Sequence, residues 1–228
     1  MRKFIISLVC AAFAVAGSFA EPIHDPSCLD SVIALGSYEG TPNRDLDVWK
    51  REIAEYSRRH YGPAEWKLTP TAIVLHYTAS AVFPMNLLVS ESYQGEAPGL
   101  ASHFVVQQKG KKILFYRLLP LDVMSRATFG ANFCSISIEI VAVDEDDLLS
   151  RPEVLDAVCR LVSELMVKYS IPAERVFGHQ EIDEMLASDS RGMFFDNTIQ
   201  GKFVPRKIDP GKRVMEYIRG RIASVDPI

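Results

Sequence analysis

The chain has 228 residues, of which 48% are hydrophobic and 24% are charged. A chain of this length and composition can bury a sizeable core, so we expect an ordinary globular domain that needs neither disulfides nor metal for stability alone. The formal net charge is only −4 at pH 7 and no block of basic residues occurs, which argues against nucleic acid or an anionic membrane as the main partner.

The first 20 residues have the pattern of a secretory signal peptide. Arg2 and Lys3 precede an uncharged stretch over residues 4–17, which Ser18-Phe19-Ala20 closes with small residues. This stretch is shorter than the roughly 20 residues of a membrane-spanning helix, and no similar stretch follows it in the sequence. We therefore predict an exported protein, periplasmic or else extracellular, with no transmembrane segment after the signal.

Residues 21–41 are rich in Pro, Gly, Asp and Ser, which predicts an N-terminal arm before a domain that covers residues 42–228. Apolar side chains then recur at helical spacing between residues 45 and 60, with Asn43 as the expected cap. A continuously apolar run at 72–75 predicts a buried strand that ends at His76.

The rest of the chain alternates predicted strands and helices. Strands are predicted at 103–107 and 112–117, which form a hairpin, and at 135–141 and 176–179; helices are predicted at 151–169 and 213–222. Residues 180–206 are expected to form a long loop. Strands interspersed with helices and without a repeat predict a single-domain α/β fold, with a central mixed β-sheet flanked by helices. We expect this domain to be a monomer.

Three cysteines remain after the signal: Cys28, Cys134 and Cys159. An odd number leaves at least one thiol unpaired in an oxidising compartment. Cys134 and Cys159 lie among apolar residues, which favours burial as small hydrophobic side chains over pairing. Their pairing with Cys28 stays open.

Two histidines, His76 and His179, end short apolar strands, where α/β sheets place their ligand sites, and Asp209 follows in a turn. A single histidine at a strand end is more often a hydrogen-bonded core residue than a ligand. Two histidines and a carboxylate, however, form a set that gives zinc three protein ligands and leaves a fourth position open, as catalytic sites do. Spacing alone does not decide between these readings.

Five segments carry a resemblance to a known family. They are residues 73–78 (IVLHYT), 101–106 (ASHFVV), Asn132 with 135–139 (SISIE), 176–182 (VFGHQEI) and 207–211 (KIDPG). In this order they resemble the motifs of the type 2 N-acetylmuramoyl-L-alanine amidases, which share their fold with the peptidoglycan recognition proteins. The resemblance implies a zinc enzyme that acts on peptidoglycan or muropeptides, cutting the amide between N-acetylmuramic acid and L-alanine of the stem peptide.

On this resemblance His76, His179 and Asp209 are the expected Zn²⁺ ligands. Glu139 matches the carboxylate that takes the proton of the attacking water and passes it to the leaving amine; the alternative is an acid paired with a structural cation. Lys207, two positions before Asp209 in an extended segment, projects to the same side and is expected to stabilise the oxygen that gains charge; the alternative is a solvated basic residue.

Four further residues are expected to line the substrate cleft, although each could also serve packing or a turn: Tyr77, His103, Phe104 and Asn132. Glu181 is the rival acid, expected on the solvent side of its loop. The chain departs from many relatives at Val123–Ala127, where a His-Ala-Gly segment is replaced and no histidine remains. This departure affects the expected contacts with substrate and leaves the expected ligands in place.

Two other functions compete with the zinc amidase. One is a peptidoglycan-binding module of the same fold without catalysis; the presence of all three ligand positions, Glu139 and Lys207 argues against it. The other is a thiol hydrolase with Cys134, or Cys28 with His24, as nucleophile. No cysteine has neighbours in the sequence that would activate a thiolate, which argues against this second alternative.

Overall fold

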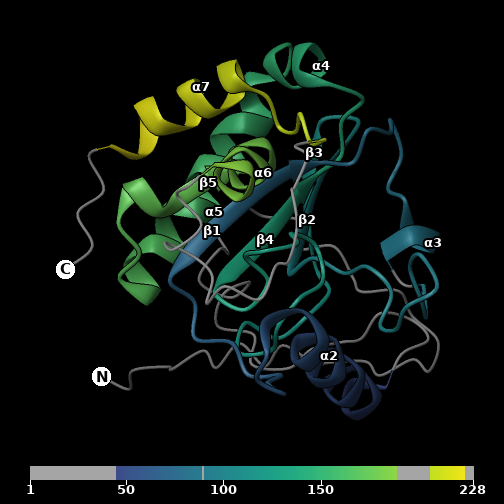
Figure 1. The fold of residues 1–228 in the computed structure, drawn as a ribbon. Coiled ribbons are helices and arrows are strands. Elements are labelled where there is room, and N and C mark those ends of the chain that lie inside the picture. Colours follow the sequence, from purple (N-terminus) through teal and green to yellow (C-terminus); the bar gives the residue numbers. More distant parts are fainter. Residues whose placement is uncertain (1–44, 89, 189–205, 224–228) are drawn as a thin grey trace, which may run out of the picture.

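The structure, a computed structural model, describes residues 45–88, 90–188 and 206–223. Its centre is a five-stranded mixed sheet in the order β3-β2-β4-β1-β5, flanked by helices (Figure 1). The strands are β1 (Ala72–Tyr77), β2 (Phe104–Lys109), β3 (Lys112–Arg117), β4 (Ser135–Ile140) and β5 (Val176–Gly178). The predicted single-domain α/β fold is confirmed. The predicted signal peptide and N-terminal arm, with Cys28 and Asn43, lie outside the described residues.

The helices are α2 (Leu46–Tyr61), α3 (Met85–Leu88), α4 (Glu145–Leu149), α5 (Pro152–Tyr169), α6 (His179–Ala187) and α7 (Lys212–Ile222), with a short 3₁₀ turn at Ala173–Arg175. Strand β1 pairs in parallel with β4 on one side and β5 on the other, and β4 pairs in parallel with β2. The predicted hairpin is confirmed as the antiparallel pair β2–β3.

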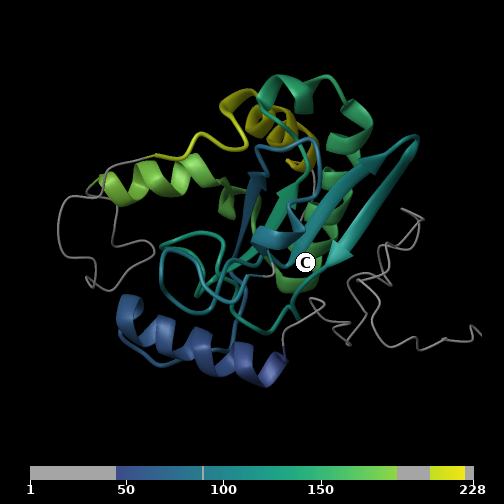
Figure 2. The same ribbon diagram turned by 90° about the vertical axis from the view of Figure 1, so that its right-hand side faces the viewer.

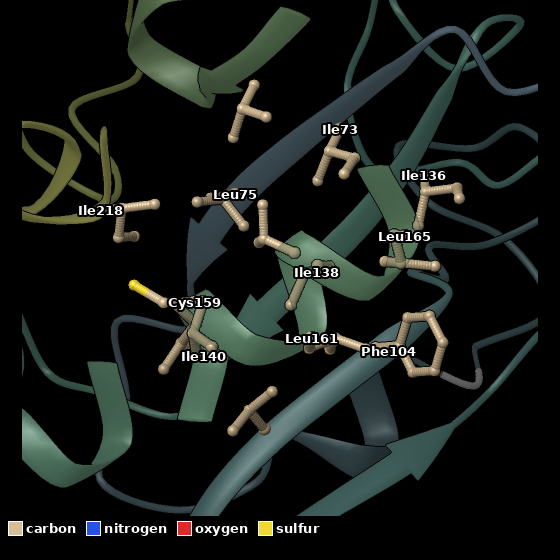
Figure 3. Close-up of a cluster of buried hydrophobic side chains, with 14 of the residues drawn as sticks. Ile73, Leu75, Phe104, Ile136, Ile138, Ile140, Cys159, Leu161, Leu165 and Ile218 are labelled. Carbon is tan, nitrogen blue, oxygen red and sulfur yellow. The ribbon is translucent and has the colours of Figure 1, made fainter. Parts of the chain in front are cut away.

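One face of the sheet packs against α5 and α7. Figure 3 shows Ile73 and Leu75 of β1 and Ile136, Ile138 and Ile140 of β4 in one buried cluster with Leu161 and Leu165 of α5 and Ile218 of α7. Because side chains alternate along a strand, these residues share one face. Burial of each such side chain stabilises the fold by about 1.5–3 kcal/mol, so this layer fixes β1 and β4 firmly in register.

The opposite face of the same two strands carries the polar side chains. His76 of β1 is the register partner of Glu139 of β4, and the parallel pairing turns both side chains to this second face. Helix α6 covers part of it, with Ile182 and Leu186 packed on Val74. The sheet therefore separates an apolar core from a polar site.

Helix α2 lies at the far end of the molecule from α4 and α7 (Figure 2). Its cap is Asp45 and not Asn43, since the Asp45 carboxylate accepts hydrogen bonds from the backbone N–H groups of Asp47 and Val48. The helix is anchored by Trp49, whose indole N–H donates to the Met124 carbonyl oxygen at 3.0 Å. Helix α2 thus stabilises the connection between β3 and β4, which contains Met124.

One predicted region is corrected. Residues 180–187 belong to helix α6 and not to the expected long loop, and His179 begins this helix instead of ending the strand before it; residues 189–205 lie outside the described part of the chain. The acidic run after β4 forms the short helix α4, capped by Asp144. Within the ranges that the structure describes, none of the helices has the length and hydropathy required to span a bilayer.

Candidate metal centre

His76, His179 and Asp209 lie together at the carboxyl ends of β1 and β5. The Asp209 Oδ2 atom is 3.2 Å from His76 Nδ1 and 3.3 Å from His179 Nδ1. The ligand atoms of all three residues lie within 4.8 Å of one another, and each residue is less than a tenth exposed. Two imidazole nitrogens and one carboxylate oxygen therefore converge on one small volume, although the residues are widely separated in sequence.

Each of the three side chains is held by a different element. His76 lies near the end of β1, a strand hydrogen-bonded on both sides, and His179 is the first residue of α6, directly after β5. Asp209 lies in the segment before α7, and its carbonyl oxygen accepts a hydrogen bond from the Gln180 backbone N–H at 3.0 Å. Helix α6 therefore contributes one candidate ligand and also holds the segment that carries another.

The segment after Asp209 is fixed by a clamp between α4 and α7. The Glu145 carboxylate accepts from the Arg213 backbone N–H at 2.7 Å and from the Arg213 guanidinium. Gly211 lies beside it with φ 99°, and a Cβ atom at this position would collide with the Glu145 carboxylate. Only glycine satisfies both the backbone and the space, and this explains the glycine of the Lys-Ile-Asp-Pro-Gly motif.

Two further residues face the outer nitrogens of the imidazoles. Thr128 Oγ1 is 2.9 Å from His76 Nε2, and Asp183 Oδ1 is 4.0 Å from His179 Nε2. Sequence reasoning missed both. Thr128 belongs to no motif and lies 52 positions from its partner, so nothing short of the fold could identify it. Asp183 follows His179 by four positions, a helical spacing that was hidden because a loop was expected there.

The residues present fit a metal ion. His179 Nδ1 is buried and makes no hydrogen bond of normal geometry within the described residues. Burial, together with the neighbouring His76 imidazole, lowers the pKa of His179 to about 4, so its ring is neutral at pH 7 and offers a lone pair. Burial alone would raise the pKa of Asp209, but contacts with His179 and His76 outweigh it and hold that pKa below its usual range. A buried carboxylate and inward-facing imidazole nitrogens are the donor set of zinc.

Glu139 borders this group from the neighbouring strand. Its Oε2 atom is buried and has no hydrogen-bond partner among the described residues. Burial raises the pKa of this carboxyl group above its usual value, and the charges of His76 and Lys207 offset part of that rise. The Lys207 side chain is exposed, so its ammonium group is free to approach a bound molecule.

The other residues expected in the cleft divide into two groups. Tyr77 is partly exposed and packs against the apolar cluster, on the opposite face of β1 from His76. The expectation is corrected for His103, Phe104 and Asn132, which are fully buried. His103 accepts from the Ser137 N–H through Nδ1, and its Nε2 bonds the Val123 carbonyl oxygen, so neither ring nitrogen is available to a substrate or a metal.

Phe104 packs in the core between the sheet and α5. The Asn132 oxygen accepts from the backbone N–H groups of Ala127 and Thr128, which positions the threonine beside His76. Glu181 is not on a loop: it lies in the first turn of α6, accepts from the Gly178 N–H and forms an ion pair with Arg219 at 2.6 Å. These contacts give Asn132 and Glu181 structural roles.

Several solved structures resemble the chain at low identity. The N-acetylmuramoyl-L-alanine amidase LysC from Clostridium intestinale URNW is 18% identical, with 68% of this chain and 87% of that chain covered and a TM-score of 0.45. The catalytic domain of XlyA is 21% identical, with 69% and 88% covered and a TM-score of 0.42. AmiD from E. coli, in complex with the substrate anhydro-N-acetylmuramic acid-L-Ala-D-gamma-Glu-L-Lys, is 19% identical, with 53% and 52% covered and a TM-score of 0.40.

No curated protein matches the chain. The sequence profile of the family described as N-acetylmuramoyl-L-alanine amidase matches residues 66–212. This range covers more than half of the chain and includes β1, β4, α6 and all three residues of the candidate metal centre. The chain therefore belongs to the N-acetylmuramoyl-L-alanine amidase family.

Proposed function

We propose that the chain is an exported, zinc-dependent N-acetylmuramoyl-L-alanine amidase acting on peptidoglycan or muropeptides. The observation that carries this proposal is the convergence of His76, His179 and Asp209, with the unpartnered carboxylate of Glu139 on the adjacent strand. Family membership supports the amide substrate. The pattern of residues 1–20 supports export, since peptidoglycan lies outside the cytoplasm.

In this proposal the two histidines and Asp209 hold the ion. A zinc ion bound by three protein ligands supplies a Lewis acid for a carbonyl oxygen and activates water near neutral pH. Glu139 takes a proton from the attacking water and returns it to the nitrogen of L-alanine as the C–N bond breaks. Its position opposite His76 and its buried oxygen support this role. Lys207 stabilises the oxygen that gains negative charge.

The thiol alternative conflicts with the surroundings of the described cysteines. Burial raises the pKa of Cys134 to about 12 and that of Cys159 to about 11. Both thiols are free and buried, so the thiolate form that a nucleophile requires is rare at neutral pH. The described cysteines are thus expected to serve packing alone.

The test uses the chain without residues 1–20, purified cell-wall sacculi and mass spectrometry of the released products. The wild type is expected to release stem peptides beginning with L-alanine, to lose activity with a chelator and to regain it with zinc. Glu139→Gln is expected to keep one zinc ion and to lose at least about 100-fold in kcat, because proton transfer supplies about 10²–10⁴ in rate. Glu174→Gln, at an exposed acid outside the site, is the matched control.

Each alternative has its own signature in this assay. A protein that binds muropeptides but releases no stem peptide is a binding module, and the proposed activity is then wrong. Activity that resists chelation and is lost on alkylation of thiols supports the cysteine hydrolase instead.

A further inference from the structure

The segment that carries Lys207 and Asp209 is held to α6 by one buried carboxylate. Asp183 Oδ2 accepts hydrogen bonds from the backbone N–H of Arg206 at 2.9 Å and from that of Lys207 at 3.0 Å. Asp183 is only 3% exposed. Backbone donors to a charged acceptor form stronger hydrogen bonds than neutral pairs, so this contact is a firm attachment.

A second contact extends the attachment to Asp209 itself. The Gln180 N–H donates to the Asp209 carbonyl oxygen at 3.0 Å. Helix α6 therefore holds the incoming segment at three backbone atoms: the nitrogens of Arg206 and Lys207, and the oxygen of Asp209. His179 begins the same helix, so α6 sets the separation between the His179 imidazole and the Asp209 carboxylate.

The other oxygen of Asp183 faces the same histidine. Asp183 Oδ1 lies 4.0 Å from His179 Nε2, across one turn of α6, and both side chains are 4% exposed. This separation is too long for a hydrogen bond, so the Asp183 carboxylate is a close neighbour of the His179 ring and not its hydrogen-bond partner. Asp183 thus lies beside one candidate ligand, His179, and holds the segment that carries another, Asp209, without belonging to the candidate ligand set.

We infer that Asp183 is a positioning residue that ties the Arg206–Asp209 segment to α6 and thereby sets the geometry between His179 and Asp209. The functional part of this inference rests on the proposed zinc site. The hydrogen bonds from Arg206 and Lys207 to Asp183, which we call the tether, are present in the chain without metal. Asp183 does not touch the reacting atoms; it acts through the ligands and through the backbone of Lys207.

The test compares Asp183→Leu, which removes both acceptor oxygens, with the nearly isosteric Asp183→Asn, which keeps one neutral acceptor. Glu184→Leu, at the next and solvent-exposed position of α6, is the matched control. In the metal-free proteins, hydrogen exchange at the Arg206 and Lys207 amides is measured by NMR. We expect exchange at least about tenfold faster in Asp183→Leu, an intermediate rate in Asp183→Asn and the wild-type rate in Glu184→Leu.

Zinc affinity, measured by competition with a chelating dye, gives the second readout. The dissociation constant is expected to rise about 10–100-fold in Asp183→Leu and to stay unchanged in Glu184→Leu. Wild-type exchange rates at both amides in the Asp183 variants overturn the inference, as does wild-type zinc affinity in Asp183→Leu. If that variant does not fold, the exchange rates of Asp183→Asn decide. If the wild type does not bind zinc, the proposed function is wrong. The hydrogen-exchange rates then still show whether Asp183 holds the Arg206–Asp209 segment to α6.

Discussion

The two ring nitrogens of His76 have different partners, and this asymmetry determines how the residue can act. Nδ1 faces Asp209 at 3.2 Å and Nε2 meets Thr128 Oγ1 at 2.9 Å. If Nε2 carries the proton and donates to the threonine, Nδ1 presents its lone pair to the metal centre. Ligand histidines commonly fix their tautomer through such an outer hydrogen bond.

Replacement of Thr128 by valine removes this acceptor with little change of volume. We expect Thr128→Val to weaken zinc binding about tenfold, and Thr128→Ser to restore most of the loss because it keeps the hydroxyl group. Zinc titration measures both, and NMR of the imidazole nitrogens reports the tautomer of His76. Equal affinities for the valine and serine variants would show that the hydroxyl group does not orient the ring.

His103 makes the stability of the fold depend on pH. Burial lowers the pKa of this imidazole to about 4, below the usual value of 6.5 that it regains on unfolding. Its contribution is therefore complete above pH 6.5 and is lost as the pH falls toward 4. From these values the free energy of unfolding should drop by about 2 kcal/mol between pH 7 and pH 5 on account of this residue.

His103→Gln should remove that part of the pH dependence. Urea unfolding of the wild type and the variant at pH 7 and pH 5 measures the fall in the free energy of unfolding for each protein. The difference between the two falls isolates the contribution of His103 from that of the other titrating groups. Parallel drops in the two proteins would contradict the assignment. The variant is also expected to be less stable at pH 7, because the bonds to Ser137 and Val123 are altered.

The histidines near strand ends could be predicted from the sequence, whereas the partners of their ring nitrogens could not. His76 and His179 follow short apolar runs, and the motif around Asp209 is specific. His103 lies next to an apolar run too, at its start, yet it is fully buried and both of its ring nitrogens are hydrogen-bonded. Nothing local separates a ligand histidine from a buried one, since the difference depends on which segments the fold brings to each ring.

At the scale of elements, the start of α7 depends on a backbone that only glycine adopts easily. Gly211→Ala adds a side chain at φ 99° against the Glu145 carboxylate, so we expect a loss of about 1–3 kcal/mol in the free energy of unfolding. Gly220→Ala is the matched control, because a Cβ atom there meets nothing within 4 Å. It should stabilise the helix by up to about 1 kcal/mol.

Urea denaturation of both alanine variants tests this contrast. Equal effects at the two positions would show that neither the backbone angle nor the carboxylate restricts Gly211. Zinc affinity provides a further check, since a shift at Gly211 displaces the preceding Asp209, whereas a change at Gly220 does not reach it.

The long helices could be predicted, and the short ones could not. Helix α5 has 18 residues and nine buried side chains, among them Val154, Val158, Leu161, Val162 and Leu165 at helical spacing. Helix α6 has nine residues and offers only Ile182 and Leu186 as buried aliphatic positions. Two positions four apart do not define a period, and α4, with five residues, offers even less. Packing of α6 on β1 and β5, and of α4 on α5 and α7, stabilises these short helices, which local sequence does not reveal.

At the scale of the whole molecule, the candidate ligands join three segments that are distant in sequence. An ion that binds only the folded chain stabilises it by about 2.7 kcal/mol when its concentration is 100 times the dissociation constant. For a chain of this size we expect zinc to raise the melting temperature by about 5–10 °C. Calorimetry with zinc, and with a chelator, measures the shift.

His76→Ala should abolish the zinc-dependent shift in melting temperature, whereas His60→Ala should preserve it. His60 lies on α2, outside the candidate metal centre, and contacts Glu96. A zinc shift that survives in His76→Ala would place the ion elsewhere on the molecule.

The register of β1 against β4 also makes the centre a reporter of correct folding. His76 and Glu139 share a face only while these strands pair as observed, and a slip by one residue would turn one of them into the apolar layer. Asp209, 133 positions beyond His76, joins them only after β5 and α6 have docked. During refolding with cobalt(II) as a coloured substitute, the absorption of the bound ion should therefore appear last, after the fluorescence and circular dichroism have settled.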